Sequence, residues 1–99
     1  MHAAHAVRHA GELALAAGET AAAGDHFRTA LDHYRLDPET KPLDLANALR
    51  GAALHAVAID DTTRAEALWR EARGIYADLS IAAGVAEADA ALAALGLGS

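Results

Sequence analysis

Three histidines near the amino terminus have the spacing of a metal-chelating helix face. His2, His5 and His9 stand at positions i, i+3 and i+7, so a helix would point all three imidazoles in one direction. Neutral imidazole is a common ligand of transition metals. No nearby carboxylate completes a known motif such as two histidines flanking a glutamate. A metal-binding protein or an enzyme that uses these histidines therefore stays an alternative to a solvated first helical turn.

A second polar cluster could supply an Asp and His pair for general acid and base catalysis. Its members are Asp25, His26, Thr29, Asp32 and His33. Catalysis would also need a substrate pocket and groups that stabilise an oxyanion, but the cluster contains a single hydroxyl and no glycine-rich turn. We interpret it as the solvent-exposed face of a helix and expect no enzymatic activity.

Composition limits the remaining classes of function. The 99 residues carry a formal charge of −6 with eight Lys and Arg, whereas nucleic acid is usually bound by a basic patch. Cysteine is absent, which excludes disulfides and thiolate metal sites. No signal peptide is recognisable, and the most apolar window, residues 81–98, carries Glu87 and Asp89, which disfavours a membrane span. We expect a cytoplasmic protein without a cofactor and without a nucleic-acid or membrane partner.

Alanine supplies much of the 54% hydrophobic content and favours closely packed helices, because it has the highest helix propensity and the smallest apolar side chain. No stretch alternates apolar and polar residues as a strand would. We predict an all-α fold with helices at about 3–17, 20–36, 43–59, 62–79 and 84–95. Asp61 or Thr62 can cap the fourth helix, and Glu19 or Thr20 the second.

The chain repeats itself with a period of 42 residues, which separates Phe27 from Trp69. The same offset relates Ala23 to Ala65, Ala30 to Ala72, Tyr34 to Tyr76 and Arg8 to Arg50. A fixed period of about 20 to 50 residues is typical of stacked helical units that bury their apolar faces on one another. Because large and small residues recur in one register, we expect Phe27 and Trp69 in the core and both tyrosines partly buried.

This order of small and large residues resembles the tetratricopeptide repeat family. The residues that carry the resemblance are Gly11, Ala14, Ala23, Phe27 and Ala30, followed by Ala53, Ala56, Ala65, Trp69 and Ala72. The period is longer than the usual one of about 34 residues, and the proline expected near the end of each second helix is absent. The resemblance implies one domain over residues 1–99, with antiparallel helix pairs at about 3–36 and 43–79 and a closing helix at about 84–95.

In the resembled family, the first helix of each repeat lines a concave groove, so the resemblance implies a non-catalytic protein-interaction module. Carried over to this chain, the groove residues are His5, Arg8, Glu12, Asn47, Arg50 and Leu54, with Leu15 and Val57 beside them. Arginine offers a planar fork that suits carboxylates, and asparagine can hold a peptide backbone. We expect a protein or peptide partner that carries an acidic group. Alternatively, Arg8 and Arg50 merely pair with Glu12 and Asp44 on the surface.

The closing helix offers a second candidate surface. Its expected core side carries Val85, Ala88, Leu92 and Leu95, and the other side is rich in alanine, with Ala86, Ala90, Ala93 and Ala94. Alanines make a flat surface on which another helix can lie without losing side-chain entropy. This surface predicts self-association of the chain or stacking on further repeats, and a purely structural homo-oligomer stays an alternative function.

Overall fold

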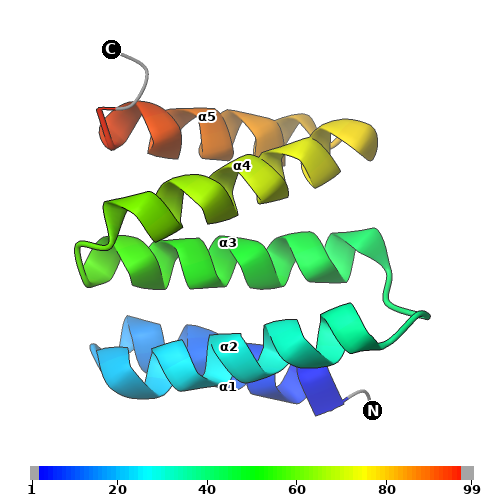
Figure 1. The fold of residues 1–99 in the computed structure, drawn as a ribbon, viewed down its shortest axis with the longest axis vertical. Helices are drawn as coiled ribbons and strands as arrows, with labels where there is room; N and C mark the ends of the chain where they lie inside the picture. Colours follow the sequence, from blue (N-terminus) through cyan, green and yellow to red (C-terminus); the bar gives the residue numbers. More distant parts are fainter. Residues whose placement is uncertain (1–2, 97–99) are drawn as a thin grey trace.

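The computed structural model describes residues 3–96 as a stack of five α-helices (Figure 1). The helices are α1 (Ala3–Ala16), α2 (Thr20–Leu36), α3 (Pro42–Ala58), α4 (Thr62–Asp78) and α5 (Ala82–Ala94). No strand occurs within the described residues. The all-α prediction is therefore confirmed, and every predicted helix boundary lies within two residues of the observed one.

Successive helices run antiparallel and pack in sequence along the stack (Figure 1). α2 packs between α1 and α3, and α4 packs between α3 and α5, while α1 also touches α3. The molecule therefore has the arrangement of a helical repeat, with two layers of helices. The outer side of the layer made by α1, α3 and α5 is the odd-helix face.

The same backbone turn reverses the chain after α1, α3 and α4. Gly18, Asp60 and Ser80 adopt left-handed φ angles of 80°, 59° and 58°. The N–H of each following residue donates to a carbonyl five residues earlier, as in Glu19 to Ala14, Asp61 to Ala56 and Ile81 to Tyr76. This is the Schellman pattern, which satisfies the free carbonyls at a helix end. Each turn takes three residues, so the next helix packs directly on the previous one.

The helix starts agree with the capping prediction at α4 and not at α2. Asp61 accepts a hydrogen bond from the N–H of Arg64, as expected of an N-cap residue. At α2 the Glu19 side chain makes no cap bond, and the Thr20 hydroxyl donates back to the Gly18 carbonyl at 3.4 Å. The predicted side-chain cap of α2 is therefore wrong, because Thr20 turns toward the preceding turn.

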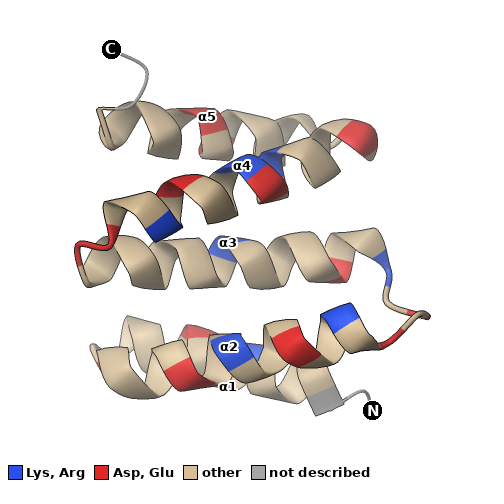
Figure 2. Cartoon of the chain, in the orientation of Figure 1, with Lys and Arg blue, Asp and Glu red and all other residues tan. Residues whose placement is uncertain are grey.

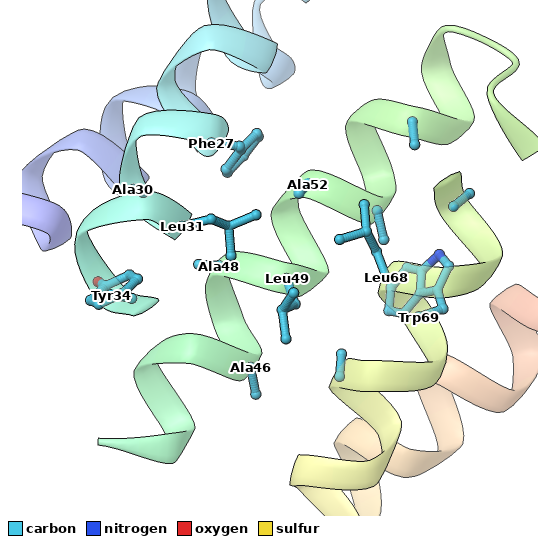
Figure 3. Close-up of a cluster of buried hydrophobic side chains, with 14 of the residues drawn as sticks. Phe27, Ala30, Leu31, Tyr34, Ala46, Ala48, Leu49, Ala52, Leu68 and Trp69 are labelled. Carbon is cyan, nitrogen blue, oxygen red and sulfur yellow. The ribbon is translucent and has the colours of Figure 1, made fainter. Parts of the chain in front are cut away.

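A few large side chains fill the spaces between alanine-rich helices. Figure 3 shows Phe27 and Leu31 of α2 on one side of α3, and Leu68 and Trp69 of α4 on the other. The largest fully buried side chains are Trp69, Tyr34, Phe27 and Leu49. The core prediction for Phe27 and Trp69 is confirmed.

The two tyrosines are more deeply buried than predicted. Tyr34 is 2% exposed and Tyr76 is 3% exposed, so the expectation of partial burial is wrong. A tyrosine can be buried completely when its hydroxyl finds a hydrogen-bond partner inside the protein. Both hydroxyls have such a partner, on α1 for Tyr34 and on α3 for Tyr76.

Glycine allows the helices to approach closely around the Phe27 ring. A Cβ atom added at Gly51 would lie 2.2 Å from Cε1 of Phe27, and one added at Gly11 would lie 3.0 Å from the same atom. The ring therefore rests against the backbones of α1 and α3 at once. The close packing predicted at Gly11 is found, and Gly51 contributes the tighter approach.

Candidate interaction surface

The odd-helix face brings together the residues predicted to bind a partner. His5, Arg8 and Glu12 come from α1, and Asn47, Arg50 and Leu54 come from α3. One hollow of about 230 Å³ lies between α1 and α3. Another of about 530 Å³ lies between α3 and α5. Arg50 lines both hollows, so it stands at the centre of this face.

The hollow between α1 and α3 has an apolar floor and a charged rim. Its lining residues are Glu12, Leu15, Ala16, Phe27, Arg50, Gly51 and Leu54. Phe27 is 1% exposed and forms the bottom, because Gly51 has no side chain to cover the ring. The hollow therefore suits an apolar side chain that is flanked by polar groups.

The larger hollow lies between α3 and α5. Its lining residues are Leu43, Asn47, Arg50, Tyr76, Ile81, Ala83, Gly84 and Glu87. At its base the Tyr76 hydroxyl donates to Oδ1 of Asn47 at 2.7 Å. Burial raises the pKa of Tyr76, and the positive charge of Arg50 acts in the opposite direction. Because Oδ1 of Asn47 is used as an acceptor, its amide N–H groups are the donors that a ligand would meet.

Arg50 holds a carboxylate of the same chain across the larger hollow. Its Nε donates to Oε1 of Glu87 at 2.5 Å, and its Nη2 donates to Oε2 at 2.8 Å. These hydrogen bonds lower the pKa of Glu87 and raise the pKa of Arg50. The alternative prediction that Arg50 pairs with Asp44 is therefore wrong. Glu87 was not predicted as the partner, since no local spacing relates residues 37 positions apart.

His5 lies between α2 and α3 and contacts residues of both. Its Nδ1 shares a hydrogen bond of 2.5 Å with the Tyr34 hydroxyl, and its Nε2 lies 3.8 Å from Oδ2 of Asp44. Burial raises the pKa of Tyr34, while the positive charge of Arg8 lowers it and Asp44 and Glu12 add to the increase. His5 thus links three helices at one end of the odd-helix face.

Arg8 differs from its counterpart Arg50, because no carboxylate of residues 3–96 pairs with it. Its Nε is buried and finds no acceptor among the residues that the structure describes. Its charge acts on both Tyr34 and Tyr76, which places it close to the centre of the face. Within residues 3–96, Glu12 approaches His9 at 3.7 Å and forms no ion pair with Arg8. The alternative pairing of Arg8 with Glu12 is not found.

The histidines do not form a metal centre in the described part of the chain. His2 lies outside the described residues. His5 contacts Tyr34, and the His9 side chain is 70% exposed beside Glu12. Across residues 3–96, no three or more His, Asp or Glu side chains are grouped as metal ligands would be.

The polar cluster on α2 is a solvated face, as interpreted from the sequence. Asp25, Thr29, Asp32 and His33 are exposed, and His26 is half-buried. Arg28 pairs with Asp25 at 3.3 Å on this face. The cluster therefore lies in water and not in a pocket.

The alanine-rich side of α5 faces outward. Ala88 is buried against α4, with Val85, Leu92 and Leu95 partly buried around it. The four alanines predicted to self-associate are all exposed: Ala86, Ala90, Ala93 and Ala94. Their exposure leaves this surface accessible to another helix.

Comparison with known proteins gives no relative to guide the interpretation: no protein family, curated protein or solved structure matches the chain. Among the described helices, none combines the length and the apolar character needed to cross a bilayer.

Proposed function

We propose that the chain is a non-catalytic interaction module of the tetratricopeptide type, which binds a peptide or protein segment on the odd-helix face. Arg8 carries the proposal. It is a partly buried cation with no carboxylate partner in the described chain, one helical turn from Glu12 on the rim of the apolar hollow. Withdrawing a charge from water without a partner costs free energy. A ligand that supplies a carboxylate would recover part of that cost.

The two halves of the site favour a partner of mixed character. The hollow above Phe27 can hold an apolar side chain, and the Arg8 guanidinium can donate paired hydrogen bonds to an acidic one. Asn47 offers amide donors to a carbonyl group of a peptide backbone. We therefore propose a segment in which an acidic residue stands close to an apolar residue.

Several features support the assignment to this type of repeat. The antiparallel stack and the small residues at the helix contacts are typical of it, although the period of 42 residues is longer than the usual one. Figure 2 shows acidic and basic residues intermixed along α2 and α4, and mixed charge does not favour a nucleic-acid backbone. A cytoplasmic location and the absence of a cofactor are part of the same proposal.

A photo-crosslinking experiment tests this function. The crosslinking residue p-benzoylphenylalanine replaces Leu54, which lines the apolar hollow, or Ala67, which is exposed on α4. The Leu54 position should yield a defined crosslinked protein in a native cell extract, and the Ala67 position should not. Circular dichroism confirms that both variants keep their helices. Identical products from both positions would overturn the proposal.

The outer side of α5 supports a second candidate, in which the chain also associates with itself. Within Ala82–Ala94, Ala88 alone is buried, and the helix packs on α4 without a partner on its other side. Replacing Ala90 and Ala93 with Glu should lower the mass in light scattering toward 10.2 kDa. A wild-type mass of 10.2 kDa at high micromolar concentration would exclude this candidate.

A further inference from the structure

The two equivalent arginines of the odd-helix face are in different states. Arg50 forms a two-point ion pair with Glu87 of α5, whereas Arg8 has no carboxylate partner within residues 3–96. Counted from the first residue of each helix, the position of α3 that corresponds to Glu87 of α5 carries Asn47, so the first repeat lacks the acid that the second has. The Glu87 carboxylate bound to Arg50 therefore shows which kind of group an arginine at this position binds.

The ion pair between Arg50 and Glu87 is open to competition. The two side chains are each 40% exposed, and they meet beside a hollow of about 530 Å³ that a ligand could enter. An ion pair with this exposure is weak, because water screens the charges. A second carboxylate brought into the hollow by a bound partner can therefore replace Glu87 without unfolding the site.

The attachment of α5 is consistent with such a replacement. α5 packs on α4, whereas its backbone does not come close to that of α3. Within Ala82–Ala94 the single buried residue is Ala88, whereas α4 buries Ala65, Leu68, Trp69, Ala72 and Tyr76. An element with little buried surface moves at low cost in free energy. Losing the bond to Arg50 would therefore leave α5 held by α4 and free to adjust.

We infer that Glu87 is an internal competitor for Arg50, which keeps the hollow between α3 and α5 closed to acidic ligands until a partner's carboxylate takes its place. The inference rests on the proposed function and adds its regulation. In this arrangement Arg8 is available to the first acidic group of a partner. A second acidic group binds only by displacing Glu87, so the face discriminates against partners with a single acid.

The test uses glutarate, a small dicarboxylate, as the probe on the whole chain. Two-dimensional NMR resolves the Nε–Hε signal of each arginine, and Arg8→Lys and Arg50→Lys variants assign the two signals. Glutarate is titrated into the wild type, into Glu87→Gln and into Asp89→Asn. The last variant removes the same charge from α5, but breaks the ion pair with Arg73 and not the one with Arg50. Sodium chloride at equal ionic strength controls for screening.

In the wild type, glutarate should shift the Arg8 signal at lower concentrations than the Arg50 signal, because glutarate must displace Glu87 to reach Arg50. In Glu87→Gln both signals should shift in a saturable manner, and Asp89→Asn should behave as the wild type. A Glu87→Ala variant should repeat the result of Glu87→Gln. The role of Glu87 would be overturned by an Arg50 response that is equal in wild type and Glu87→Gln, or that is absent from both. If the Arg8 signal still shifts in that case, the proposed binding site at Arg8 stands. The loss of the Arg8 response as well would overturn the proposed function.

Discussion

The Tyr76 hydroxyl donates to Asn47 Oδ1 at 2.7 Å and so joins the two helices of the second pair. One period earlier, the Tyr34 hydroxyl and His5 Nδ1 make the corresponding hydrogen bond between α2 and α1. Both bonds join residues that are 29 positions apart. The repeat therefore includes a buried polar contact as well as the packing of small and large side chains. This contact fixes the position of one paired helix along the axis of the other.

Replacing Tyr76 with Phe should lower the free energy of unfolding by about 1 kcal/mol, because it removes one hydrogen bond and leaves Asn47 Oδ1 without its donor. Urea unfolding measures the change. A double-mutant cycle with Asn47→Ala should show coupling between the two residues. Additive effects would contradict a direct hydrogen bond.

Trp69→Ala should lower the free energy of unfolding by about 3–5 kcal/mol, since it empties a large volume in the core. Trp69 is 1% exposed, as is its counterpart Phe27, so Phe27→Ala should have a similar cost. Denaturant unfolding with circular dichroism detection measures both. A loss below about 1 kcal/mol for either variant would place that ring outside the core.

Gly51→Ala should destabilise the fold by about 1–3 kcal/mol through overpacking, although alanine is the better helix former. The added Cβ would lie 2.2 Å from Cε1 of the buried Phe27 ring, which cannot swing aside. Gly74→Ala is the matched control. Nothing lies within 4 Å of a Cβ at this exposed α4 position, and the same change there should stabilise by about 0.5–1 kcal/mol. Equal effects of the two changes in thermal melts would contradict the close approach at Phe27.

The ion pair between Arg50 and Glu87 predicts a dependence of stability on pH. The pKa of Glu87 is lowered from its ordinary value of 4.5 in the folded chain. Its contribution is therefore fully present above pH 4.5 and is lost as the pH falls through the lowered pKa. Because both side chains are 40% exposed, screening limits the contribution to about 0.5 kcal/mol.

Comparison of the wild type with Glu87→Gln in urea at several pH values measures this contribution. The wild type should be the more stable of the two at pH near 7, and the difference should shrink as the pH falls below 4.5 through the lowered pKa of Glu87. A difference that grows as the pH falls would contradict the ion pair.

Local sequence signals were sufficient to locate the helices. Pro42 has the fixed φ and the missing N–H that suit a first helical position, and it begins α3. Gly18 allows the left-handed turn after α1, and Asp60 holds the same conformation one period later. The alternation of helices and turns follows from these residues together with the high helix propensity of alanine.

The position of α5 and the contacts that depend on it could not be predicted from the period. A shift of 42 residues from Pro42 would start α5 at residue 84, but α5 begins at Ala82. The connection after α4 has three residues, whereas the one after α2 has five. This shorter connection sets where Glu87 lies relative to Arg50, and no spacing within the sequence reports it. The full burial of the tyrosines escaped prediction for a similar reason, since each hydroxyl has its partner on another helix.

The binding of a partner through Arg8 is tested most directly by charge reversal. The dissociation constant of the protein crosslinked through Leu54 is measured for the wild type, for Arg8→Glu and for Arg28→Glu. Arg28 is an exposed arginine of α2 that pairs with Asp25 away from the odd-helix face, so its reversal makes the same change in net charge. Arg8→Glu should weaken binding by about tenfold or more, as the loss of an interfacial charge pair does, and Arg28→Glu should leave it nearly unchanged. Equal affinities for the two variants would contradict the account.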